Sequence, residues 1–192
     1  MGNMEALYNT WKAIGVSGGD LSFFQNFFVK FYQAFIEADR WLQYLNGVKT
    51  TLLVTALALI LGVALGVTVA ILRTAHDQQR PGHRNPVLAV LNLVCKIYVT
   101  VIRGTPMMVQ LLIMGFVIFA SSRNFTMIGT LTLGINSGAY VSEIVRGGLM
   151  SVDKGQMEAG RSLGLGYGTT MRFVIVPQAV KAILPALGNE FI

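Results

Sequence analysis

Four side chains that can hold a small polar solute lie close together inside an apolar stretch. The stretch covers residues 126–146 (TMIGTLTLGINSGAYVSEIVR) and contains Asn136, Ser137, Tyr140 and Glu143. If it is one helix that reaches a membrane surface near Arg146, Asn136 lies about 15 Å deeper, at about 1.5 Å of rise per residue. Polar side chains at such a depth are costly, so they are expected to face a solute pathway. Amide and hydroxyl groups there offer the donors and acceptors that a zwitterion needs.

Glu143 has two roles that are consistent with the sequence. Its carboxylate can bind the ammonium group of a solute, which would favour cationic solutes if it faces the pathway. It can equally pair with Arg146, which lies three residues along the same helix.

A second group of candidate pathway residues flanks a proline. Thr105 and Gln110 lie on either side of Pro106, which removes a backbone donor and disfavours helical geometry at the residue before it. The carbonyl groups freed by this break can face a cavity. Alternatively, nearby groups satisfy them locally, and both interpretations fit the sequence.

The composition indicates that these residues belong to a membrane protein. Hydrophobic residues make up 53% of the 192 residues and charged residues only 12%, whereas soluble domains carry about a quarter charged residues. The net charge is +6, but the charged residues lie between apolar runs and do not form a basic face with aromatic residues. This argues against nucleic-acid binding. A single cysteine, Cys95, cannot form an intrachain disulfide or a thiolate metal cluster, and we expect it to fill space in a core.

The hydrophobic pattern predicts an all-α fold, a polytopic membrane helix bundle. About 20 apolar residues span a membrane, and residues 47–72 form the first such run. Residues 86–103 are predicted to form an amphipathic helix, with Asn85 as its N-cap and Pro86 at its first position. The other expected crossings are residues 105–120 and 126–146, followed at 173–192 by the beginning of a fourth.

Two spacings within these segments carry information about packing. Gly62 and Gly66 are four residues apart and allow another helix to approach closely, from the same subunit or from a second copy. Within 86–103, polar residues recur at helical spacing and therefore share one face: Asn92, Lys96, Thr100 and Arg103. That helix is expected to lie near one leaflet or against the bundle.

Lys and Arg residues near the helix ends predict the orientation in the membrane. One side has Arg73, Arg80, Arg84, Arg146, Lys154, Arg161 and Arg172, and the other has Lys30, Arg40, Lys49 and Arg123. The more basic side is predicted to be cytoplasmic, which places the N-terminus outside and residues 147–172 inside. Residues 1–20 lack the pattern of a removable signal peptide, so we expect them in the mature protein.

The N-terminal segment, residues 1–45, is expected to be extracytoplasmic and to carry an interfacial amphipathic helix. Phenylalanines recur every four residues from Phe23 to Phe35, and Ser22 with Gln25 has the pattern of a capping box. Such an aromatic stripe suits a helix that lies on the outer leaflet. Packing against the bundle is the alternative.

The polar segment 147–172 contains a second short helix, predicted over 153–163. Asp153 is its expected N-cap and Gly164 its expected C-terminal stop. The small residues Ala159 and Gly160 would let this helix seat in the groove of a partner protein, where the Glu158 carboxylate could meet a basic group. A solvated surface helix is the alternative.

This segment resembles the cytoplasmic signature shared by the membrane subunits of binding-protein-dependent ABC importers. The residues that carry the resemblance are Glu158, Ala159, Gly160, Gly164 and Pro177; Gly160 replaces the second Ala of the signature, and Val174 and Val176 replace its usual Ile and Leu. Further matches are similar to the polar amino acid subfamily: Arg103-Gly104-Thr105-Pro106 with Val109-Gln110, Ala139-Tyr140 with Glu143, Arg146-Gly147-Gly148, Gly155-Gln156 and Pro177-Gln178-Ala179.

The resemblance covers about residues 45–192 and implies that 46–192 are an ABC importer transmembrane domain in the bacterial inner membrane. In that family the permease is not an enzyme: it pairs with a second permease subunit, binds ATPase subunits that hold the ATP, and receives an amino acid from an extracytoplasmic solute-binding protein. The resemblance assigns coupling to the ATPase to Gln156, Glu158, Ala159, Gly160 and Gly164. Family members usually have five membrane helices, so the end of the fourth and all of the fifth are expected beyond this chain.

Other functions find less support in the sequence. The glycines at 164, 166 and 168 lack the Gly-Lys-Ser/Thr ending of a phosphate-binding loop, so we expect no cofactor in this chain. His76 and His83 lie in a basic loop without convergent carboxylates, which argues against a metal site. A gated channel would need a filter or a ring of charges, and a membrane scaffold would not need Asn136, Tyr140 and Glu143 on one central helix.

Overall fold

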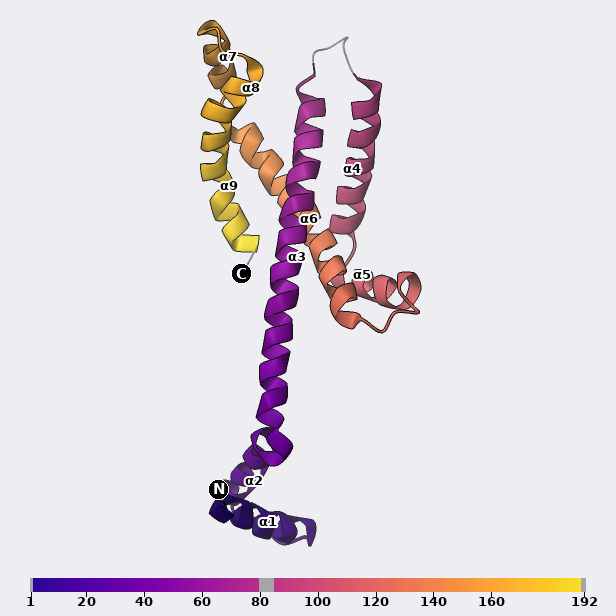
Figure 1. Ribbon diagram of the computed structural model, residues 1–192, viewed down its shortest axis with the longest axis vertical. Coiled ribbons are helices and arrows are strands. Elements are labelled where there is room, and N and C mark those ends of the chain that lie inside the picture. Colours follow the sequence, from indigo (N-terminus) through magenta and orange to yellow (C-terminus); the bar gives the residue numbers. More distant parts are fainter. Residues whose placement is uncertain (1, 80–84, 191–192) are drawn as a thin grey trace. The chain divides into compact units, whose positions relative to one another are not determined.

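We describe the protein from a computed structural model, which places residues 2–79 and 85–190 (Figure 1). Arg80, His83 and Arg84 lie outside these ranges, as do the last two residues of the expected fourth membrane stretch. The described residues form helices joined by short connections, with no β-strand among them, which confirms the all-α prediction. They divide into two compact units, Met1–Leu53 and Val54–Ile192, and each is described by itself.

The first unit begins with two helices, α1 (Gly2–Val16) and α2 (Phe23–Phe35). The start of α2 is the one predicted from the capping-box pattern. There the backbone amide of Ser22 donates a hydrogen bond to Gln25 Oε1 at 2.9 Å, so one of the amide donors left free at a helix N-terminus is satisfied.

Aromatic side chains join α1 to one face of α2. The rings of Tyr8 and Tyr32 stack with their centroids 4.3 Å apart, and Trp11 meets Phe28 edge to face at 5.3 Å. Lys12 of α1 forms an ion pair with Glu37 at 2.7 Å. The hydrogen bonds that Lys12 makes with Glu37 and Tyr8 raise the pKa of its ammonium group above the usual value, so this residue is charged at neutral pH.

The opposite face of α2 carries an exposed row of four phenylalanines, which we call the phenylalanine stripe: Phe23, Phe27, Phe31 and Phe35, with 79%, 61%, 46% and 42% of their surface exposed. The rings of Phe31 and Phe35 stack at 4.9 Å, and Phe35 contacts Tyr44 at 5.2 Å. Tyr44 lies in the first turns of α3 (Arg40–Asp77), which follows a short 3-10 turn, η1 (Glu37–Asp39). The stripe is therefore continuous with the apolar surface of α3.

Within residues 2–79 and 85–190, three helical stretches are long and apolar enough to cross a membrane, and the expected crossing at 126–146 is not one of them. The first contains α3, which extends beyond the predicted 47–72 at both ends. The second is α4 (Pro86–Gly104), and the third is formed by α8 (Tyr167–Thr170), the π-helical η3 (Met171–Ile175) and α9 (Val176–Glu190). The three stretches span Glu37–Asp77, Pro86–Gly104 and Tyr167–Asn189.

The prediction that residues 105–120 cross the membrane is wrong, and the preceding helix α4 has the length of a crossing instead. Helix α5 (Met107–Ile113) and the π-helical η2 (Met114–Ile118) form an apolar helix that is shorter than a span, whereas α4 has the length of one. The polar periodicity of α4 is real, but it does not mark a helix on a leaflet: Asn92 bonds to His76 of α3, and Arg103 lies over Tyr140. In Figure 1, α5 runs across the end of α4 and not along it.

The centre of the second unit is α6 (Phe125–Ser151), which packs closely against α3. A Cβ on Gly62 would lie 2.8 Å from Ser137 Oγ, and one on Gly66 would lie 2.6 Å from Val141 Cβ. The predicted glycine pair therefore serves packing within the subunit. The polar and small composition of α6 also matches its place in the bundle, because Thr132 and Ser142 are 2% and 0% exposed.

Helices α4 and α9 pack on other parts of α6. The Tyr98 hydroxyl of α4 donates to the Ile135 carbonyl of α6 at 2.5 Å. Cys95 is buried beside Val69 and Val99, as expected for a small apolar filler. A core formed by α3, α6 and α9 contains Ala70, Val141, Val145, Ala179 and Ile183.

Within the second unit, the C-terminal end of α3 and the helix α7 (Lys154–Ser162) lie at the same end, as Figure 1 shows. Side chains from both line one pocket, which confirms that they are neighbours. Arg73, Arg146, Lys154 and Arg161 belong to this end by their positions in these helices. These are four of the five described cations that were assigned to one side of the membrane from sequence; the fifth, Arg172, lies in η3.

Candidate functional site

Three of the predicted pathway residues share one face of α6. Asn136, Tyr140 and Glu143 are spaced by four and three residues, so they lie above one another along the helix. All three are half-buried. Ser137 points about 100° away, at 3.6 residues per turn, and lies against Gly62 of α3. The predicted group is therefore divided between a polar face and a packing contact.

Gln110 of α5 replaces the donor that Pro106 cannot supply. In a continuous helix the Ile102 carbonyl would accept from the amide of residue 106, but proline has no N–H. Gln110 Nε2 donates to that carbonyl at 2.8 Å and to the Thr105 carbonyl at 3.1 Å. The backbone groups freed at the break are thus satisfied locally, which is the second of the two interpretations of this site.

The same amide also connects the break to α6. Gln110 Oε1 accepts a hydrogen bond from Asn136 Nδ2 at 3.1 Å, and Gln110 is only 8% exposed. Thr105 Oγ1 accepts from Gln110 Nε2 at 2.9 Å. Thr105, Gln110 and Asn136 therefore form one polar group, although they come from three separate parts of the sequence.

Tyr140 has a cation over its ring. The Arg103 guanidinium of α4 lies 5.1 Å from the ring centroid, within the range of a cation–π interaction. Arg103 is exposed in the isolated chain. Tyr140 lies one turn along α6 from Asn136. Its ring, with the Arg103 guanidinium of α4 over it, is therefore the next polar contact on this face of α6.

Glu143 pairs chiefly with a residue that the sequence did not indicate. Its carboxylate Oε1 contacts the Arg73 guanidinium of α3, and both side chains are largely buried, with 26% and 12% exposed. The expected partner Arg146 is present but more distant, with its Nε 3.8 Å from Glu143 Oε2. Glu143 therefore acts as a contact between α3 and α6 in this structure.

Arg146 extends these ion pairs to the end of α3. Its Nη1 lies 3.0 Å from Asp77 Oδ2. We call the four residues Arg73, Asp77, Glu143 and Arg146 the α3–α6 ion network. Next to this network, Asn92 Nδ2 of α4 lies 3.1 Å from His76 Nδ1 of α3, which links the network to α4. Within residues 2–79 and 85–190, no group of three or more His, Cys, Asp or Glu side chains gathers as a metal site would require.

The predicted coupling helix forms as α7 and has the expected ends. Asp153 Oδ1 accepts from the Gly155 amide at 2.6 Å. The helix closes with the Leu165 amide donating to the Gly160 carbonyl at 3.0 Å, and Gly164 has a φ of 77°, where a side chain is strained. The local signals at both ends of this helix are confirmed.

The face of α7 that carries Gly160 packs within the chain. A Cβ on Gly160 would lie 2.5 Å from Thr170 Cγ2, so the residue must be small to fit against α8. Gln156, Glu158 and Ala159 are exposed instead. Gln156 Oε1 receives only a long contact of 3.4 Å from Gln178 Nε2. The exposed part of α7 is therefore the part that a partner protein can reach.

The roles of two residues, Arg73 and Leu163, were missed in the sequence analysis. In the sequence analysis Arg73 was used only to predict the orientation in the membrane. A carboxylate such as Glu143 in an apolar helix needs a cation as its partner, and this need was the signal that could have identified Arg73. Leu163, which is 79% exposed at the end of α7, was not considered. Its apolar side chain beside the glycines was the signal for an exposed contact.

Comparison with known proteins adds to this geometry. Residues 87–192 match a family model described as "Binding-protein-dependent transport system inner membrane component". The putative glutamine transport system permease protein GlnP of Rickettsia prowazekii (strain Madrid E) is 36% identical over 151 residues, which cover 77% of this chain and 64% of the relative. The arginine transport system permease protein ArgU of Corynebacterium glutamicum is 36% identical over 157 residues, which cover 74% of this chain and 46% of the relative.

A solved structure is also similar. It is described as "Crystal structure of an amino acid ABC transporter with histidines", and it has a TM-score of 0.62 and 40% identity to this chain. The match covers 78% of this chain and 69% of the solved one. The chain thus spans 64% of the length of the Rickettsia prowazekii relative and a similar share of the solved chain.

Proposed function

The chain belongs to the binding-protein-dependent transport system inner membrane component family, and we propose on that basis that it is the permease subunit of an ATP-driven amino acid importer. It is a multi-pass inner-membrane protein. In this proposal it forms the translocation pathway and passes the movement of a separate ATPase subunit to that pathway. ATP is bound and hydrolysed on the partner chain.

One observation carries the proposal. The match to the family covers residues 87–192, and this range contains both the polar face of α6 and the exposed face of α7. A pathway needs polar groups within apolar helices, and coupling needs a rigid projection that a partner can hold. The two features lie on consecutive helices, so a movement of α7 reaches α6 through a short connection.

The proposed pathway follows the polar face of α6 and the residues that meet it. Thr105, Gln110 and Asn136 offer amide and hydroxyl groups, Tyr140 offers a ring and a hydroxyl, and Ser137 lies beside the α3 contact. Glu143 lies beyond the end of this row, where Arg73 holds its carboxylate. Such groups suit the carboxylate and ammonium of a polar amino acid. The named relatives transport glutamine or arginine, which supports this class of substrate.

The exposed residues of α4 support a second permease subunit as a partner. Lys96, Thr100 and Arg103 are polar and exposed on a helix long enough to cross a membrane. Charged side chains there are too costly to leave against lipid. A neighbouring subunit or the pathway between two subunits would give them a polar surrounding. An extracytoplasmic solute-binding protein completes the proposed assembly and delivers the amino acid.

Uptake measurements test the function as a whole. Vesicles that contain the full-length subunit, its ATPase and its binding protein should accumulate glutamine or arginine only when ATP is supplied. Flux without ATP would indicate a gated channel, and no flux with a correctly assembled complex would indicate a scaffold. Either result would overturn the proposal.

The ATPase contact is proposed to involve Gln156, Glu158 and Ala159 of α7, with Leu163 at its tip and with Gly160 and Gly164 shaping the helix. An exposed leucine at a helix end is apolar surface that a partner can cover. Gly160 supports the contact indirectly, because its fit against Thr170 fixes α7 on the chain.

Replacing Ala159 with Trp should uncouple ATP hydrolysis from transport. The residue is exposed, so the folded subunit accommodates the larger side chain, but a closely fitting groove on the ATPase does not. We expect uptake to fall about tenfold or more, the effect of losing about 1.4 kcal/mol or more at a contact. Thr169→Trp, at an exposed position outside α7, serves as the matched control and should leave uptake unchanged. Normal uptake by the Ala159→Trp protein would remove α7 from the contact.

The orientation is proposed to place the N-terminus outside and α7 in the cytoplasm. The phenylalanine stripe is proposed to lie in the outer leaflet, because it continues through Tyr44 onto the apolar surface of α3. Helix α1 covers the other face of α2, where Tyr8 stacks on Tyr32. The stripe is therefore the face of α2 that remains for lipid.

Single cysteines in a protein without Cys95 should report this orientation. A membrane-impermeant thiol reagent should label Lys154→Cys only from the cytoplasm and Ser17→Cys only from outside. Phe31→Cys should be protected in membranes and become reactive once detergent dissolves the lipid, because the lipid covers it. Labelling of Lys154→Cys from outside would invert the topology, and fast labelling of Phe31→Cys in membranes would remove the stripe from the leaflet.

A further inference from the structure

The four charges of the α3–α6 ion network can be paired in two ways. In this structure the pairs run between the helices. Arg73 of α3 contacts Glu143 of α6, and Asp77 of α3 lies 3.0 Å from Arg146 of α6. We call this arrangement the crossed pairing, because it joins the ends of the two helices.

The same four residues can also pair along each helix. Arg73 and Asp77 are four residues apart on α3. Glu143 and Arg146 are three residues apart on α6. Side chains at these spacings are neighbours on a helix surface, and opposite charges there attract each other. We call this second arrangement the in-helix pairing. It neutralises the same charges but leaves α3 and α6 unjoined at this end.

Arg146 is already close to the in-helix pairing. Its Nε lies 3.8 Å from Glu143 Oε2, which is within the range of an ion pair but too long for a hydrogen bond. This Nε is buried and has no hydrogen-bond partner within the described part of the chain. A shift of the Glu143 carboxylate toward Arg146 would supply that partner and lengthen the contact with Arg73.

A second unsatisfied group lies next to Arg73 in the chain. Thr74 Oγ1 is buried, and within residues 2–79 and 85–190 it forms no hydrogen bond. Among the buried side-chain nitrogen and oxygen atoms of these residues, only this oxygen and Arg146 Nε lack a partner. Buried polar groups without partners cost folding free energy and are rare in native structures. Both lie at this end of α3 and α6, so the crossed pairing does not satisfy every group there.

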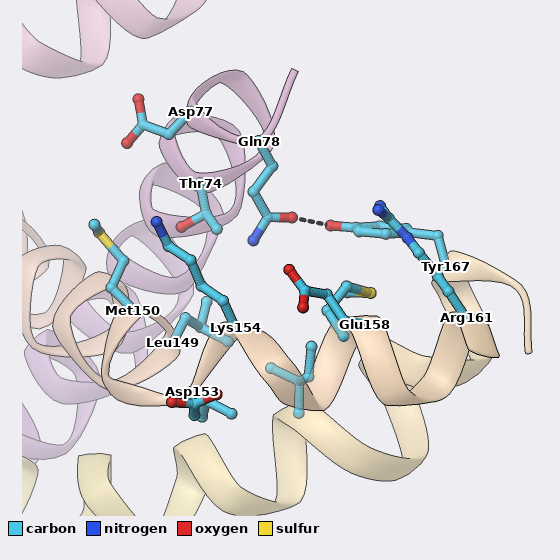
Figure 2. A pocket seen from close by; sticks show the side chains of 13 residues that line it. Thr74, Asp77, Gln78, Leu149, Met150, Asp153, Lys154, Glu158, Arg161 and Tyr167 are labelled. Carbon is cyan, nitrogen blue, oxygen red and sulfur yellow. Dashed lines mark hydrogen bonds between the residues drawn. The ribbon is translucent and has the colours of Figure 1, made fainter. Parts of the chain in front are cut away.

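The end of α3 has room to move and is tied to the segment that carries α7. An open space of about 420 Å³ separates Asp77 and Gln78 from α7. Across this space the Tyr167 hydroxyl of α8 donates a hydrogen bond to Gln78, as Figure 2 shows. Two turns before Arg73, Gly66 packs closely on α6 and can serve as a pivot. Movement of α7 and α8 therefore reaches the end of α3 beside the network.

We propose that the α3–α6 ion network is a two-state clasp, which joins the helix ends in the crossed pairing and releases them in the in-helix pairing. All four charges are neutralised in both states, so the exchange avoids the uncompensated buried charge that a simple break would leave. The role of the clasp rests on the proposed function. Movement of the ATPase, passed through α7 and α8 to Gln78, changes the balance between the pairings, and release lets the ends of α3 and α6 separate during transport.

Charge exchanges within the network test the clasp, because each of two double variants permits only one pairing. Arg73→Glu with Glu143→Arg allows the crossed pairing and places like charges along each helix; we call it the crossed-only variant. Arg73→Glu with Asp77→Arg allows the in-helix pairing and places like charges across the helices; we call it the in-helix-only variant. The quadruple variant adds Glu143→Arg and Arg146→Glu to the in-helix-only variant and permits both pairings again.

Uptake of L-glutamine or L-arginine is measured in proteoliposomes that hold the full-length subunit with its ATPase and binding protein. Each double variant should lower ATP-dependent uptake about tenfold or more, which corresponds to about 1.4 kcal/mol or more in the balance between the pairings. The quadruple variant should recover most of the wild-type uptake. A network that only stabilises the fold makes a different demand, since the crossed-only variant keeps both contacts between the helices. Normal uptake by that variant, or a quadruple variant no better than the doubles, would overturn the clasp.

A distance measurement decides the clasp without transport and without the charge variants. Spin labels at Ala75→Cys and Ser151→Cys, both at exposed positions outside the network, report the separation of the helix ends in a protein without Cys95. The purified wild-type complex should show two distances whose proportions differ between the nucleotide-free and the ATP–vanadate-trapped forms. The crossed-only variant should show the shorter distance in both forms.

The outcomes separate the clasp from the function on which its role rests. A single distance that is the same in both forms of the wild-type complex overturns the clasp, even if a charge variant does not fold, and leaves the importer in place. If wild-type proteoliposomes show no ATP-dependent uptake, the proposed function fails. Two distances in the wild-type complex, with one of them lost in the crossed-only variant, would still establish the exchange of pairs.

Discussion

Replacing Glu143 with Gln should destabilise the protein, and replacing Arg73 with Gln in the same chain should restore most of the loss. The single change leaves the Arg73 guanidinium, whose side chain is only 12% exposed, without its main partner. An uncompensated charge in such a place costs about 2–3 kcal/mol. The double change removes both charges and leaves two neutral amides that can bond to each other.

Thermal unfolding in detergent measures this prediction, with amino acid uptake alongside. Asp20→Asn, an exposed carboxylate in the first unit, is a control that should unfold like the wild type. The alternative role of Glu143, as the group that binds a substrate ammonium, makes different demands. It requires unchanged stability, a lower preference for cationic over neutral amino acids, and no rescue by Arg73→Gln. These results would return Glu143 to the substrate pathway.

Local signals in the sequence were sufficient for the helix ends. Asn85 caps α4 by accepting from the Val87 amide at 2.9 Å, and Asp153 caps α7 in the same way. Both depend on residues within three positions of one another, so the chain needs no tertiary structure to favour them. The positive φ of Gly164 belongs to the same class.

Long-range partners could not be read from the sequence. Arg73 and Glu143 are separated by 70 residues, and any cation near a helix end could have paired with the carboxylate. The partner of Gly160 could not be read from the sequence either. A small residue there suits the groove of a partner protein or a close neighbour in the same chain. Only the fold identifies that neighbour as Thr170. Residue type restricts the kind of contact, while the crossing of helices selects the partner.

The division of the apolar stretch after Pro86 shows a different limit. A polar row on α4 suits a leaflet surface, a bundle or a second subunit, and the sequence offered no way to rank these surroundings. The proline break was read correctly as the end of a helix, since α4 stops at Gly104. Which side of the break crosses the membrane depends on the length of the helix there, and α5 with η2 is too short to span a membrane. Amphipathicity alone was therefore a poor guide.

Replacing Gly66 with Leu should prevent the second unit from folding correctly. A Cβ at this position would lie 2.6 Å from Val141 Cβ and Cγ1 and 2.9 Å from the Gly138 carbonyl oxygen, and that oxygen belongs to the backbone of α6. Backbone cannot yield as a side-chain tip does, so the two helices must separate. We expect a loss of about 3 kcal/mol or more in the free energy of unfolding.

Gly47→Leu is the matched control, because it lies on the same helix and a Cβ there meets nothing within 4 Å. Gly66→Ala should give an intermediate loss. The measurement is the thermal midpoint and the fraction of monodisperse protein after purification in detergent. Equal midpoints for Gly66→Leu and Gly47→Leu would mean that α3 and α6 do not cross here. The α3–α6 ion network would then lose its basis too, because Arg73 follows Gly66 by two turns of α3 and reaches Glu143 only while the crossing holds.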